Sequence, residues 1–107
     1  MLTMFYIEAS GFGRGLGVLD YSKERIKKSY MLNPALISNE QRELIVSAFS
    51  ELKTRDVKKT SEELFEMDRV RFEHVVLQSF GIDHLFEDIR QSLLSMQKTR
   101  LLVKAVD

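Results

Sequence analysis

The densest basic cluster of the chain lies between two tyrosines and has the composition of a nucleic-acid contact. Closely spaced lysine and arginine side chains neutralise backbone phosphates without reading the base sequence. The rings of Tyr21 and Tyr30, which flank the cluster, could stack on bases. The same composition also fits an ordinary solvated surface, so both interpretations stay open. The cluster comprises Lys23, Arg25, Lys27 and Lys28.

A glycine-rich stretch from Gly11 to Gly17 suggests a phosphate-binding loop but lacks the required spacing. A dinucleotide fingerprint that starts at Gly11 needs glycine at Leu16, and no Gly-Lys-Ser/Thr sequence follows for a P-loop. So many glycines lose much conformational entropy wherever they become ordered. We therefore expect a turning loop that is either mobile or held by a partner.

The remaining ionisable residues do not have the spacing of a catalytic or metal site. His74 and His84 should lie on different helices, and neither belongs to a pair of histidines four residues apart. The chain has no cysteine, which excludes thiolate chemistry, disulfides and cysteine-based metal sites. We expect no catalytic residue, no metal and no bound cofactor in this chain. The acidic residues around position 65 should be solvent-face charges that pair with Arg69 and Arg71 across one turn.

The N-terminal part is expected to form β structure. Thr3 to Glu8 is rich in aromatic and β-branched residues, and Gly17 to Tyr21 is a second candidate strand. Two strands alone are marginally stable in water, so they should pack on helices or on sheet neighbours outside this chain. We expect a short β-hairpin or strand pair within residues 1–36, followed by a helical domain over residues 37–107.

Capping signals and apolar periodicity predict the helices. Ser38 and Gln41 form a capping box that starts a helix over about 39–53. A second helical region runs over about 61–80, bent or broken near Asp68, and Asp83 should cap a last helix. The predicted fold class is mainly α (α+β), with a bundle of three to four helices. The positions expected to be buried include Leu44, Ile45, Ala48, Phe49, Leu52, Leu64, Met67, Phe72, Val75, Val76, Phe80, Leu85, Ile89, Leu93 and Met96.

The second helical region carries local start and stop signals. Thr60 and Glu63 have the spacing of a reciprocal capping box. Gly81 should adopt a left-handed conformation that ends the helix, and Ile82 should fold back on the last turn in a Schellman motif.

In their order along the chain, the pieces between residues 55 and 82 resemble the region that follows the catalytic domain in adenine-N6 DNA methyltransferases of restriction-modification systems. That region has an Arg-acid pair, an acidic residue before Glu-Leu, an Asp-Arg helix and a glycine between apolar residues. Phe72 and Glu73 depart from the usual Leu and Asp. Upstream, Glu8, the glycine run and Asn33-Pro34 resemble the last strands of the target-recognition region. The matching residues are Arg55-Asp56, Glu62-Glu63-Leu64, Asp68-Arg69, Phe72-Glu73 and Phe80-Gly81-Ile82.

The resemblance implies a non-catalytic C-terminal domain that supports target recognition in a larger parent enzyme. In the family, an Asn/Asp-Pro-Pro-aromatic tetrapeptide holds the flipped adenine, but here Asn33-Pro34 is followed by Ala35 and Leu36. The chain also lacks the glycine-rich, alternating β-α pattern of a methyl-donor site. S-adenosylmethionine would therefore bind to the catalytic domain of the parent enzyme, which is the expected partner together with DNA. The resemblance adds Arg14 to the basic cluster as a possible contact with the DNA backbone.

Composition limits the other function classes. The chain has 107 residues, sixteen basic and sixteen acidic, so no long-range field draws it as a whole onto DNA or an anionic membrane. No apolar run approaches the roughly 20 residues that span a bilayer, and we expect a soluble, cytoplasmic protein with no membrane partner. The alternative to the methyltransferase interpretation is a free-standing helical interaction or dimerisation module. Its contact with a partner or a second copy could involve Leu101-Leu102-Val103.

Overall fold

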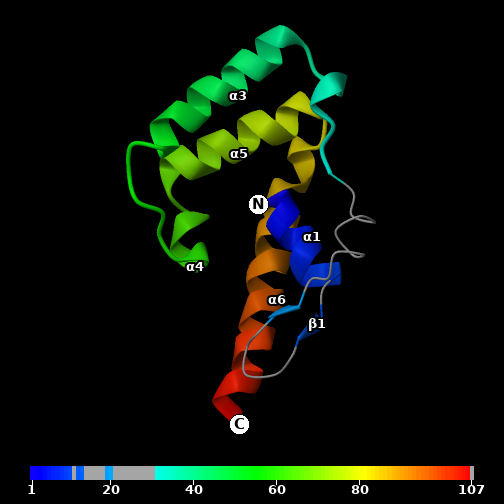
Figure 1. Ribbon diagram of the computed structural model, residues 1–107, viewed down its shortest axis with the longest axis vertical. Helices are drawn as coiled ribbons and strands as arrows, with labels where there is room; N and C mark the ends of the chain where they lie inside the picture. The colour runs from blue at the N-terminus through cyan, green and yellow to red at the C-terminus, as the bar shows by residue number, and fades with distance from the viewer. Residues whose placement is uncertain (11, 14–18, 21–30, 107) are drawn as a thin grey trace. The chain divides into compact units, whose positions relative to one another are not determined.

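The computed structural model describes residues 1–10, 12–13, 19–20 and 31–106, and this part of the chain is mainly helical (Figure 1). The chain forms two compact units. Leu32–Glu87 make up the central unit, while Met1–Met31 together with Asp88–Asp107 make up the terminal unit. None of the described helices is long and apolar enough to cross a bilayer. The predicted division of the chain after residue 36 stays a prediction.

The terminal unit contains helix α1 (Leu2–Ser10) and most of helix α6 (Phe86–Val106). An ion pair joins these two helices: Arg100 Nη2 lies 2.7 Å from Glu8 Oε1, and Arg100 Nε donates to Glu8 Oε2 at 3.1 Å. The Glu8 side chain is only 5% exposed, so the pair is part of the packed structure of this unit. Strands β1 (Phe12–Gly13) and β2 (Leu19–Asp20) are antiparallel and two residues long each.

The predicted N-terminal β-hairpin, with a first strand from Thr3 to Glu8 and a second from Gly17 to Tyr21, is wrong. Thr3 to Glu8, the expected first strand, lies within α1, and the described residues contain no strand longer than two residues. Aromatic and β-branched residues favour strands only where neighbours cover them. A helix satisfies its own backbone, as in the bond from Phe5 N to Met1 O at 2.9 Å, and the pairing of Glu8 with Arg100 holds this helix against α6.

The central unit begins with two capped turns. The Asn33 side chain accepts a hydrogen bond from Ala35 N at the start of the 3-10 helix η1 (Pro34–Leu36). Ser38 and Gln41 form the predicted capping box at the start of α3 (Asn39–Leu52): Ser38 Oγ accepts from Gln41 N, and Gln41 Oε1 accepts from Ser38 N. The break at Asn33-Pro34 and the start of the 39–53 helix are therefore confirmed.

The predicted 61–80 region is two helices, α4 (Thr60–Glu63) and α5 (Met67–Ser79), and α5 packs against α3 (Figure 1). Its stop signal is confirmed. Gly81 has φ +73°, its N–H bonds to Gln78 O, and the Ile82 N–H bonds to Leu77 O, which is the Schellman pattern. The 3-10 helix η2 (Asp83–Leu85) follows and leads into α6.

Two predicted helix caps are wrong. Lys59, not Thr60, is the N-cap of α4, and no side-chain bond caps it. The Glu63 carboxylate instead binds Arg55, whose charged donors hold it more strongly than a neutral backbone N–H could. Asp83 likewise does not cap α6 and contacts His74.

The buried side of the central unit differs in part from the expected one. Leu64 and Leu77 are 2% and 0% exposed. Leu64 and Leu52 were expected in the core, whereas Leu77 was not. Met67 was expected to be buried and is 80% exposed. Glu73 explains why the burial of Leu77 was not expected. It lies one turn before Leu77 on the same face of α5 and is itself buried, so this face looks polar in the sequence.

Candidate functional site

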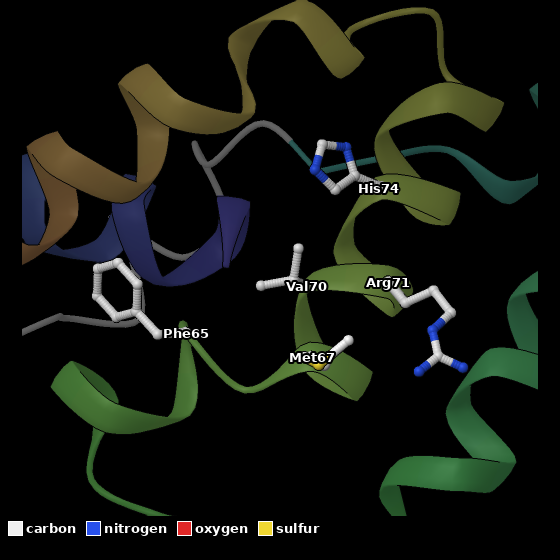
Figure 2. Close-up of a pocket in the computed structure, with 5 residues that line it drawn as sticks. All are labelled: Phe65, Met67, Val70, Arg71 and His74. Carbon is white, nitrogen blue, oxygen red and sulfur yellow. The ribbon is translucent and has the colours of Figure 1, made fainter.

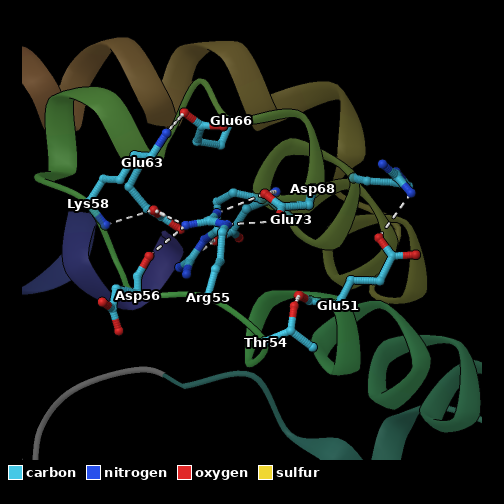
Figure 3. A network of polar contacts seen from close by, with 11 residues as sticks. Glu51, Thr54, Arg55, Asp56, Lys58, Glu63, Glu66, Asp68 and Glu73 are labelled. Carbon is cyan, nitrogen blue, oxygen red and sulfur yellow. Dashed lines mark hydrogen bonds and ion pairs between the residues drawn. The ribbon is translucent and has the colours of Figure 1, made fainter.

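A cluster of charged side chains surrounds Arg55 in the central unit (Figure 3). Arg55 follows α3 in the chain. Its Nε and Nη2 donate to the two oxygens of Asp68 at 2.8 Å each, and its Nη1 and Nη2 donate to the two oxygens of Glu63 at 2.9 Å each. Nη1 also donates to Asp56 O at 3.1 Å. Because a guanidinium has five N–H groups, these contacts use every donor that Arg55 has.

The cluster is partly withdrawn from solvent. The side chain of Glu63 is 7% exposed, and those of Arg55 and Asp68 are 25% and 23% exposed. Glu63 also accepts a bond from Lys58 N, and Asp68 Oδ1 accepts one from Arg69 N in the first turn of α5. The cluster thus ties the segment after α3 to the end of α4 and the start of α5, and we call Arg55, Glu63 and Asp68 the Arg55 clamp.

The charges of the clamp stabilise one another. The hydrogen bonds from Arg55 lower the pKa of Asp68 to about 2 and lower the pKa of Glu63 below its ordinary value. The bonds to Asp68, and then those to Glu63, raise the pKa of Arg55. All three side chains therefore stay ionised across the physiological range. A residue that serves as a general acid or base needs a pKa near the working pH, and these pKa values have been moved away from it.

The clamp predicts a specific acid sensitivity. Both carboxylates have a lower pKa in the folded chain than their ordinary values near 4, so the unfolded chain binds more protons below about pH 5. Their contribution to the free energy of unfolding is fully present above about pH 5 and is lost as the pH falls towards about 2. Urea unfolding followed by circular dichroism at pH 7, 5, 4 and 3 should show this loss. In Asp68→Asn the stability should be lower at pH 7 but fall less steeply. A wild-type stability that does not change from pH 5 to pH 3 would contradict the clamp.

Further ion pairs surround the clamp. Lys58 pairs with Glu66, and this contact raises the pKa of Lys58. Arg69 and Arg71 do not pair with the carboxylates expected from the sequence. Arg69 pairs with Glu73 one turn along α5 at 2.9 Å, and Arg71 pairs with Glu51 of α3 at 3.0 Å. The Glu73 side chain is 5% exposed, whereas those of Arg71 and Glu51 are both more than half exposed.

The structure brings together four of the twelve residues between positions 55 and 82 on which the family resemblance rests. Arg55, the Asp56 carbonyl, Glu63 and Asp68 meet in the clamp. Leu64, which follows Glu63 in the sequence, is buried. Phe80-Gly81-Ile82 forms the turn that ends α5. The pairing of Arg55 with Glu63 and Asp68 was not predicted, although these residues belong to the same motif series. The order of these charged residues along the chain singled them out in the sequence, but it did not show that they pair with one another.

A second feature is a shallow apolar hollow of about 360 Å³ beside the first turns of α5 (Figure 2). Phe65 and Met67, which line it, are 51% and 80% exposed. His74 lies at one end and its Nδ1 is 2.5 Å from Asp83 Oδ1. Among the described residues, no group of three or more histidine, cysteine or acidic side chains could hold a metal ion. The hollow is lined by Phe65, Met67, Val70, Arg71 and His74.

The sequence-based DNA-contact residues lie outside the described part of the chain, as does most of the glycine run. The structure therefore leaves that interpretation as a prediction. These residues are Arg14, Lys23, Arg25, Lys27 and Lys28. Comparison of the chain with known proteins finds no matching family model, no matching curated protein and no matching solved structure.

Proposed function

We propose that the chain is a non-catalytic C-terminal scaffold of an adenine-N6 DNA methyltransferase of a restriction-modification system. It supports the target-recognition region, and Arg14 together with the basic cluster contacts the DNA backbone. S-adenosylmethionine binds to the catalytic domain, which is the partner of this chain in the cytoplasm. The chain itself transfers no methyl group.

The Arg55 clamp is the observation that supports a scaffold. Its guanidinium has no donor left for a substrate phosphate or carboxylate, and its two carboxylates are held ionised by Arg55. Such a cluster fixes the path of the backbone between α3, α4 and α5, and it has no free group for covalent catalysis. Arg55, Glu63 and Asp68, which build this clamp, are among the residues that resemble the methyltransferase family, and we interpret them as a structural signature and not as a catalytic motif.

Neutralising the basic cluster should weaken DNA binding without changing any sequence preference. Lys27 and Lys28 would each neutralise one phosphate, so the double variant Lys27→Gln/Lys28→Gln should lose affinity for all duplexes alike. The slope of log affinity against log salt should fall by about two. Fluorescence anisotropy with labelled duplexes at several salt concentrations measures both quantities.

The matched control is Lys53→Gln/Lys98→Gln, which removes the same charge from two exposed positions outside the cluster. It should leave the slope unchanged. An equal loss in both double variants would show a non-specific charge effect, and an unchanged slope in Lys27→Gln/Lys28→Gln would remove the DNA-contact part of the proposal.

The scaffold role itself is tested with the partner. The coding region next to this chain should encode an Asn-Pro-Pro-aromatic segment and a methyl-donor domain, in frame or as a separate gene. When both parts are co-expressed, labelled S-adenosylmethionine should methylate duplex DNA more efficiently than with the catalytic part alone. Methyl transfer by the 107-residue chain alone would overturn the proposal.

The second candidate, a helical interaction or dimerisation module, is favoured by exposed leucines near the end of α6. Leu101 and Leu102 are 51% and 55% exposed. A self-associating chain would have a concentration-dependent mass in light scattering, and Leu101→Gln/Leu102→Gln would return it to a monomer. A monomer at all concentrations, together with DNA binding that depends on Lys27 and Lys28, would favour the methyltransferase scaffold.

A further inference from the structure

The outer side of α3 carries an exposed leucine next to two glutamates. Apolar periodicity predicts that Leu44 is buried, but its side chain is 59% exposed. Glu40 lies one turn before it on the same side of the helix, and Glu43 flanks it; both are exposed. Within the part of the chain that the structure describes, neither glutamate forms an ion pair. We call Glu40, Glu43 and Leu44 the α3 ridge.

The apolar hollow beside the first turns of α5 has the complementary properties. Phe65 and Met67, which line it, expose apolar side chains. Arg71 also lines it and bonds to Glu51 through Nη1 alone among the described residues, so its Nε–H and Nη2–H groups can donate to a second carboxylate. Because the hollow is shallow, it cannot enclose most of a small molecule, as ligand pockets do. A side chain that protrudes from a protein surface fits it better.

The α3 ridge and the hollow are joined through one ion pair of the central unit. Glu51 lies two turns after Leu44 on the same side of α3, and it bonds to Arg71, which lines the hollow (Figure 2). All of these residues belong to Leu32–Glu87. A surface that holds both a ridge and a matching hollow can pair with its own copy around a twofold axis, because the contact then forms twice.

We propose that a second copy of this chain covers this surface, with Leu44 of one protomer in the hollow of the other and Glu40 or Glu43 bonded to Arg71. Charge complementarity favours this occupant, since the ridge supplies carboxylates and the hollow supplies spare guanidinium donors. The contact does not depend on the proposed methyltransferase role. It also differs from a dimer through the exposed leucines near the end of α6.

The mass of the full chain in solution tests the proposal. Light scattering over a range of concentrations should show a monomer–dimer equilibrium. Leu44→Gln removes the side chain that fills the hollow and should raise the Kd of the dimer by roughly ten- to hundredfold, the factor that burial of one leucine supplies. The matched control is Val46→Gln, because Val46 is 63% exposed on a different side of the same helix. It should leave the Kd unchanged.

The charged part of the contact is tested by salt. The Kd of the wild-type dimer should rise with salt concentration, because ions screen a pair at the rim of an interface. Glu40→Gln/Glu43→Gln should raise the Kd at low salt and make it less dependent on salt. An unchanged Kd and salt dependence in this double variant would overturn the pairing with Arg71.

Engineered cysteines report the contact directly, because the chain has no cysteine of its own. Under mild oxidation, a mixture of Leu44→Cys and Met67→Cys copies should form a disulfide-linked dimer between the two variants. A mixture of Val46→Cys and Met67→Cys copies should not. A monomer at every concentration would overturn the proposal and leave the hollow to a different partner. A dimer that Leu101→Gln/Leu102→Gln abolishes and Leu44→Gln leaves intact would also overturn it.

Discussion

Replacing Glu63 with glutamine is expected to destabilise the central unit by roughly 3 kcal/mol, which is the usual loss when one partner of a buried ion pair is removed. The Glu63 side chain is 7% exposed and accepts both Nη1–H and Nη2–H from Arg55. Glutamine keeps the shape but places an amide N–H₂ against one of these donors. Arg55 would then be left with a donor that faces another donor, away from water.

Urea unfolding at pH 7 measures this loss, and Glu51→Gln is its matched control. Glu51 also pairs with an arginine, Arg71, but both side chains are more than half exposed. That substitution should therefore change the free energy of unfolding by less than about 1 kcal/mol. Equal effects of the two substitutions would mean that the clamp is solvated and adds no more than an ordinary surface pair.

Arg55→Met should be at least as destabilising as Glu63→Gln. It removes the partner of two carboxylates at once, so that Glu63 and Asp68 are left without the cation that holds both of them. In the double variant Glu63→Gln/Arg55→Met the loss should be smaller than the sum of the two single losses, because the second substitution removes charges whose partner has already gone. Additive losses would contradict a direct coupling between the two residues.

Local signals in the sequence were sufficient for the helix ends whose partners lie a few residues away. The capping box at Ser38, the turn at Asn33-Pro34 and the Schellman motif at Gly81 all depend on residues within one or two turns. The sequence could therefore specify them without knowledge of the fold. The same reasoning failed at Thr60 because Glu63 had a stronger distant partner in Arg55, which no local rule could reveal.

The errors at the N-terminus and on α5 have a common physical cause. Thr3 to Glu8 reads as a strand by residue preference, but Arg100, at the far end of the chain, pairs with Glu8 and stabilises a helix there. On α5, Glu73 makes the buried face look polar in the sequence. In the structure Glu73 is buried on that face and pairs with Arg69. In both places a glutamate lies on a packed face because an arginine pairs with it. The sequence alone does not show which arginine is the partner.

Leu77→Ala is expected to destabilise the central unit by about 2 to 5 kcal/mol. Leu77 is 0% exposed, and its replacement removes buried methyl groups and leaves a cavity that the surrounding side chains can only partly fill. A small domain is stable by only about 5 to 15 kcal/mol, so this single change would remove a large part of the total. Thermal and urea unfolding followed by the helical circular dichroism signal measure the loss.

Met67→Ala is the control that decides which face of α5 is buried. Apolar periodicity in the sequence predicts a buried Met67, whereas in the structure its side chain is 80% exposed. Truncation of an exposed methionine should change the free energy of unfolding by less than about 0.5 kcal/mol. A large loss for Met67→Ala and a small one for Leu77→Ala would place the buried face on the side that periodicity predicts. The reverse result would mean that α5 buries the face shared by Glu73 and Leu77, which requires Arg69 to neutralise Glu73 in the folded protein.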